Sequence, residues 1–146
     1  MIRKEGAMGF MEIFVGGKQH PPLTEGSQAA KMLAAMKIPL EKLTKEVSDA
    51  MEVVPADDSA YVFIGNPKKS FGMAWIEQGK VHNFKTLTEE KGIAQQQLLT
   101  MLHKIQEAYH RSGDDKRFSA MIGDRNITVT PSRELAREVK SIIATA

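Results

Sequence analysis

The chain has 146 residues, which is the size of one ordinary domain that buries its own hydrophobic core. Its 20 basic and 18 acidic residues give a formal net charge of +2, a balance that does not favour a nucleic-acid-binding surface. Because the sequence contains no cysteine, disulfides, thiolate catalysis and cysteine-ligated metal sites are excluded.

Residues 1–26 are expected to form an N-terminal segment with one short strand and a loop. Side chains alternate over residues 11–15, which predicts the strand, and the proline pair in residues 18–23 predicts the loop. The apolar run at residues 10–15 resembles a secretory signal, but Glu12 interrupts it and no small-residue cleavage site follows. No segment has the apolar length of a membrane span, so we predict a cytoplasmic protein.

Residues 27–146 are expected to form a single α+β domain that begins with two helices. Residues 27–37 are rich in alanine and methionine, and Pro39 suits the first turn of the next helix. Apolar residues then recur at helical spacing as far as Met51. Residues 54–59 are predicted to be a connector.

Three strands are predicted next. Residues 61–64 are apolar on both faces, as in a central strand, and residues 71–76 alternate between bulky and small side chains. Residues 77–80 have the composition of a turn, with Gly79 supplying a positive φ. Residues 81–85 are expected to return as the partner strand.

A long helix, a hairpin and a closing helix complete the predicted domain. The spacing Thr86-x-x-Glu89 has the form of a capping box, and the helix that follows carries an apolar stripe up to Tyr109. Residues 118–129 are predicted to form the hairpin, and Thr130 is predicted to cap the closing helix. The expected fold is an α+β domain with an antiparallel sheet of about five strands and helices packed mainly on one face.

The element order over residues 40–146 is similar to that of the dimeric class I secretion chaperones: helix, three strands, helix, two strands, helix. The resemblance implies a homodimer that binds a protein partner, and it carries over no functional residue. Helix, three strands and helix also matches double-stranded RNA-binding domains. However, residues 89–91 are Glu-Glu-Lys where those domains place a lysine cluster, so nucleic acid is not an expected partner.

The loop at residues 65–70 is the first candidate site. A glycine, adjacent lysines, an amide and a hydroxyl are groups that hold phosphates, and the candidate ligand-binding residues are Asn66, Lys68, Lys69 and Ser70. The loop is not a P-loop, because Lys68 stands in place of the required glycine and a strand follows instead of a helix. The alternative is a polar hairpin loop with solvated lysines.

The second candidate site is one face of the long helix. At about 100° per residue, His103, Glu107 and His110 fall in one narrow sector. Imidazole and carboxylate groups at this spacing are ligands for zinc or a similar ion. Because the sector points away from the apolar stripe, the alternative is a solvated polar face.

No serine, carboxylate pair or glycine-rich motif has the context that catalysis requires, and no cofactor is predicted. We therefore predict a non-catalytic interaction or regulatory module, chaperone-like in element order, that associates with a protein partner or with itself as a homodimer. The alternative is a binding domain or enzyme for a phosphorylated small ligand that uses the 65–70 loop. A broad apolar patch would favour the first function, and a deep polar pocket beside Lys68 and Lys69 would favour the second.

Overall fold

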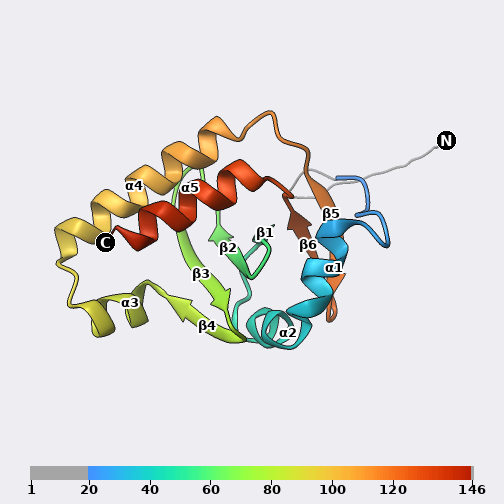
Figure 1. The fold of residues 1–146 in the computed structure, drawn as a ribbon, viewed down its shortest axis with the longest axis horizontal. Helices are drawn as coiled ribbons and strands as arrows, with labels where there is room; N and C mark the ends of the chain where they lie inside the picture. The colour runs from blue at the N-terminus through green and yellow to red at the C-terminus, as the bar shows by residue number, and fades with distance from the viewer. Residues whose placement is uncertain (1–19, 146) are drawn as a thin grey trace.

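The computed structural model describes residues 20–145, so the strand predicted at residues 11–15 lies outside the described part of the chain. The described residues form five helices and one six-stranded sheet (Figure 1), which confirms the predicted α+β class. Within this range, none of the helices combines the length and apolar character needed to cross a membrane.

The sheet has the order β4-β3-β2-β1-β6-β5, so β1 and β2, the first two strands of the described residues, lie at its centre. All neighbouring strands are antiparallel except β1 and β6, which are parallel. The strands are β1 (Met51–Pro55), β2 (Ser59–Gly65), β3 (Phe71–Glu77), β4 (Lys80–Asn83), β5 (Phe118–Ile122) and β6 (Arg125–Val129).

Each face of the sheet has its own hydrophobic core. Helices α4 and α5 lie side by side over one face, where α3 also contributes Leu87 (Figure 1). Helices α1 and α2 cover the other face, so three of the five helices share one side of the sheet. The helices are α1 (Gln28–Ala35), α2 (Lys37–Glu46), α3 (Phe84–Lys91), α4 (Gln95–Arg111) and α5 (Arg133–Ala144).

Strand β1 is the main element that the sequence analysis missed. The helix predicted to reach Met51 ends at Glu46, and the predicted connector at residues 54–59 begins within β1. Every residue of β1 is buried: β2 and β6 flank it in the sheet, and its apolar side chains pack in the cores on both faces. One partner, β2, follows directly after a short turn, whereas the other, β6, is far away in the sequence, so the position of β1 inside the sheet has no local signal. Four strands therefore precede α3, whereas the predicted order that is similar to the secretion chaperones has three.

The capping pattern predicted at Thr86 and Glu89 is wrong by one turn. The Asn83 side chain accepts a hydrogen bond from the Thr86 N–H at 2.9 Å, and the Thr86 hydroxyl accepts one from the Asn83 N–H at 2.9 Å. Asn83 is therefore the N-cap, and α3 begins at Phe84, inside the strand predicted for residues 81–85. Gly92, with φ +63°, ends α3, so the predicted long helix is two helices.

The predicted hairpin at residues 118–129 is confirmed as β5 and β6, but the cap of the closing helix is not Thr130. The Ser132 hydroxyl accepts a hydrogen bond from the Leu135 N–H at 3.2 Å, which makes Ser132 the N-cap of α5. Thr130 instead donates its hydroxyl proton to the carboxylate of Glu52 at 2.6 Å. A residue that was predicted to begin a helix therefore holds a buried acid.

Candidate functional site

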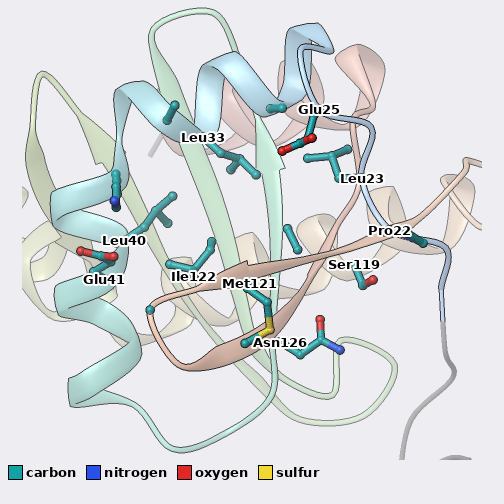
Figure 2. Close-up of a pocket in the computed structure, with 15 residues that line it drawn as sticks. Pro22, Leu23, Glu25, Leu33, Leu40, Glu41, Ser119, Met121, Ile122 and Asn126 are labelled. Carbon is teal, nitrogen blue, oxygen red and sulfur yellow. The ribbon is translucent and has the colours of Figure 1, made fainter.

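The first candidate site is a groove of about 560 Å³ between the helices α1 and α2 and the β5–β6 hairpin (Figure 2), which we call the α1–β5 groove. In Figure 2, Leu33, Leu40 and Ile122 point into the space between the helices and the hairpin. All three side chains are nearly buried, so they form a fixed apolar floor. This surface favours contact with apolar groups over contact with water.

Charged side chains lie along the rim of the groove. Glu25 and Glu41 stand toward opposite ends of it (Figure 2), and Lys37 also lines it. Within residues 20–145, no cation lies within ion-pair distance of either carboxylate. The rim therefore has one net negative charge, and its two carboxylates are available to an external cation.

One side of the groove is the outer edge of the sheet. The Ser119 N–H donates to the Pro21 carbonyl at 2.8 Å, and the Leu23 N–H donates to the Ser119 carbonyl at 2.8 Å. The backbone groups of Ser119 thus point away from β6, and the alternation of an antiparallel ladder directs those of Met121 the same way. The Met121 side chain is 66% exposed. The sheet edge is therefore open to another chain at Met121.

The second candidate site is a cavity of about 560 Å³ over β1 and β6, which we call the Glu52 cavity. The parts of the chain that enclose it are the loop after β2, the C-terminal end of α4, the segment that leads into β5, and His20 before α1. The ionisable side chains that line it are His20, Glu52, Lys68, Tyr109, His110 and Arg117.

Glu52 is 9% exposed, and three donors hold its carboxylate. One oxygen accepts the Tyr109 hydroxyl at 2.7 Å. The other accepts Nε of Arg117 at 3.0 Å and the Thr130 hydroxyl at 2.6 Å. The carboxylate is thus neutralised by Arg117, as a buried charge requires.

Arg117 also ties the end of α4 to this cluster. Its guanidinium donates to the carbonyls of Ser112 and Asp115 at 3.0 Å each and lies 5.1 Å from the centroid of the Tyr109 ring. Those bonds hold the turn that follows α4, where the Asp115 N–H also donates to the Ser112 carbonyl at 3.0 Å. The Glu52–Arg117 pair therefore connects the central strand to the helix layer.

Tyr109 is held in its neutral form. Burial first, and then its hydrogen bond to Glu52, raise the pKa of Tyr109 to about 12. At neutral pH the hydroxyl therefore remains a proton donor to Glu52 and does not act as a base. Burial also raises the pKa of Tyr61 above its ordinary value of 10.0.

We expect the folded protein to show less tyrosinate absorbance at pH 10 than the urea-unfolded chain, in which both tyrosines titrate near 10. Because the folded state holds the Tyr109 proton more tightly, this group's contribution to stability is complete below pH 10 and is lost as the pH rises toward 12. An ultraviolet pH titration measures both effects, with Tyr109→Phe as the control. Half of the full tyrosinate signal at pH 10 in folded protein would contradict the assignment.

The loop at residues 65–70 contributes to the Glu52 cavity in part. Asn66 and Lys68 line it, whereas Lys69 and Ser70 do not. The Lys68 N–H donates to the Asn66 side chain at 3.0 Å, and the Gln106 amide of α4 donates to the Pro67 carbonyl at 3.0 Å. The loop is therefore anchored to α4 in one conformation.

The three candidate metal ligands of the long helix lie in two different places in the structure. His103 and Glu107 approach to 3.6 Å and are 72% and 56% exposed, whereas His110 lines the Glu52 cavity. In the part of the chain that the structure describes, no group of three or more His, Cys, Asp or Glu side chains is placed to hold a metal ion. The structure does not bring His103, Glu107 and His110 together as a set of metal ligands, and a metal site at these residues stays a prediction.

Sequence reasoning did not single out Glu52, Arg117 or Tyr109 as members of one site. Tyr109 was assigned to the apolar stripe of a helix, and Glu52 fell at the end of a predicted helix. One signal was available: Glu52 is a single carboxylate between Met51 and the apolar pair at residues 53–54. An acid inside such an apolar run is expected to have a specific buried partner.

The two candidate sites differ in chemistry. The α1–β5 groove combines an apolar floor with a negative rim, and the Glu52 cavity combines a neutralised buried acid with a cationic loop. Comparisons with protein-family models, with curated proteins and with solved structures find no match for this chain.

Proposed function

We propose that this protein is a non-catalytic cytoplasmic interaction module, whose α1–β5 groove binds an extended apolar segment of a partner protein with a basic residue at each end. The observation that carries the proposal is the apolar floor between Glu25 and Glu41, two carboxylates without an ion-pair partner in residues 20–145. Lysine or arginine at the ends of the segment would complement both carboxylates.

The apolar floor supplies affinity, because each methylene group that the partner buries there contributes about 0.8 kcal/mol. The open backbone groups of Met121 add a main-chain contact of the kind that an extended peptide makes with a sheet edge. The rim charges contribute less to affinity than to the choice and orientation of the segment, since an exposed ion pair is worth about 0.2–1 kcal/mol.

The test compares two short synthetic peptides with the same leucine and valine core, one with lysine at both ends and one with glutamate at both ends. We expect fluorescence anisotropy to show saturable binding and a preference of about fivefold or more for the lysine-ended peptide, from two attractive rim pairs of about 0.5 kcal/mol each and from repulsion of the glutamate ends. The double variant Glu25→Gln/Glu41→Gln should remove this preference. The matched control is Glu89→Gln/Glu90→Gln on the exposed face of α3, which should retain it.

Met121 separates the main-chain contact from the side-chain contact. Met121→Ala removes the exposed side chain, and Met121→Pro also removes the outward N–H while leaving the bonds to β6 in place. We expect the proline variant to bind either peptide more weakly than the alanine variant. Equal binding of both peptides to the unmodified protein, or a preference that survives the double variant, would refute the proposal.

Light scattering tests whether the partner is a second copy of the chain, as the predicted homodimer requires. If copies occupy each other's grooves, the protein is a dimer that the lysine-ended peptide dissociates. A dimer that the peptide leaves intact would place self-association on another surface.

A further inference from the structure

We infer that the Glu52 cavity is a binding site for a small organic anion, a molecule with a phosphate or carboxylate group that Lys68 and His110 contact. This inference is independent of the α1–β5 groove and adds a small-molecule ligand to the proposed interaction function. The volume of about 560 Å³ lies within the range of metabolite-binding pockets.

The charges that line the cavity favour an anion. Glu52 and Arg117 form a buried ion pair at 3.0 Å, so together they contribute no net charge to a ligand. Within residues 20–145, no carboxylate lies within ion-pair distance of Lys68. The remaining fixed charge of the cavity wall is therefore the ammonium group of Lys68, beside the imidazole of His110.

The negative end of the α4 dipole points toward this cavity and would oppose an anion. Its last carbonyls are already bonded: the Ser112 N–H donates to Ala108 and Tyr109, the Gly113 N–H donates to His110, and Arg117 donates to Ser112. These bonds satisfy carbonyls at the end of α4, so beyond the neutralised Glu52–Arg117 pair the formal charge that lines the cavity is that of Lys68.

The cavity is also pre-formed. Gln106 anchors the loop that bears Lys68, and the Asn66 side chain bonds the Lys68 N–H. Tyr109, Arg117 and Thr130 hold Glu52 at the floor. A ligand therefore enters a site whose backbone is already ordered, which lowers the entropic cost of binding.

The test is a nuclear magnetic resonance titration of the full chain with inorganic phosphate and, separately, with acetate at constant ionic strength. We expect saturable shifts of the Gly65, Asn66 and Gly113 amides, which surround the cavity. Saturation by phosphate alone assigns a phosphorylated ligand, and saturation by acetate alone assigns a carboxylate ligand. Saturation by both supports an anion site that accepts either group.

Two matched pairs of variants locate the contacts. Lys68→Gln should weaken binding about tenfold or more, as expected for the loss of a hydrogen bond to a charged group, whereas Lys69→Gln on the same loop should not. His110→Gln should weaken binding, whereas His103→Gln on the same helix should not. Shifts that do not saturate, or equal losses from Lys68→Gln and Lys69→Gln, would overturn the inference.

Discussion

Replacing Arg117 by alanine is expected to lower the free energy of unfolding by about 3–5 kcal/mol, because it leaves the Glu52 carboxylate buried without its cation. The side chains of Glu52 and Arg117 are only 11% and 12% exposed, so the pair is mostly shielded from solvent in the folded protein. The variant also removes the bonds from Arg117 to Ser112 and Asp115, which hold the end of α4. Tyr109 and Thr130 still donate to Glu52, which favours the lower end of this range.

Urea denaturation measures this loss, and the chain offers a matched control. Arg111 forms an ion pair with Glu138 at 2.7 Å, but these side chains are 59% and 33% exposed. Arg111→Ala should therefore cost less than about 1 kcal/mol. Adding Glu52→Gln to Arg117→Ala should restore part of the stability, because the uncompensated charge is then absent. Similar losses for Arg117→Ala and Arg111→Ala would show that the buried pair has no special role.

Replacing Phe63 by alanine is expected to cost about 3–5 kcal/mol, the usual range for truncating a buried aromatic ring. Phe63 is fully buried in β2. Its ring lies 5.6 Å from that of Phe71 and 5.1 Å from that of Tyr109, between centroids. Alanine would lose both ring contacts and leave a void between the sheet and α4, which neighbouring side chains fill only in part.

The same urea titration compares Phe63→Ala with Phe84→Ala. Phe84 is partly buried, and its ring centroid lies 5.9 Å from that of Trp75 at the edge of the core, so its loss should be the smaller. Phe63→Leu retains most of the side-chain volume and should cost about 1.5 kcal/mol or less if the core repacks. Equal losses for the two alanine variants would contradict the central place given to Phe63.

Elements with a local signal were predictable from the sequence. Strand β2 was identified because it is apolar on both faces, and β3 because bulky and small residues alternate in it. The β5–β6 hairpin was identified because its strands are close in the sequence and joined by a glycine-containing turn. These patterns act over a few residues, so they remain readable without tertiary contacts.

The candidate sites were predictable only in part. Lys68 and His110 were identified from their residue types, but they were assigned to two unrelated sites. The structure places both on one cavity, whose floor is Glu52. The donors of Glu52 stand far from it in the sequence: Tyr109 at a separation of 57, Arg117 at 65 and Thr130 at 78. No short motif records contacts over such separations.

The α+β class, most of the strands and the turns are predictable from the sequence, because periodicity and turn residues act locally. The place of residues 51–55 inside the sheet became clear only from the fold, because it needs pairing with the distant β6 in addition to the local hairpin with β2. Pairing with β6 also places Glu52 beside Thr128, on the face where Arg117 and Tyr109 reach it. The Glu52 cavity therefore exists because of a long-range strand pairing.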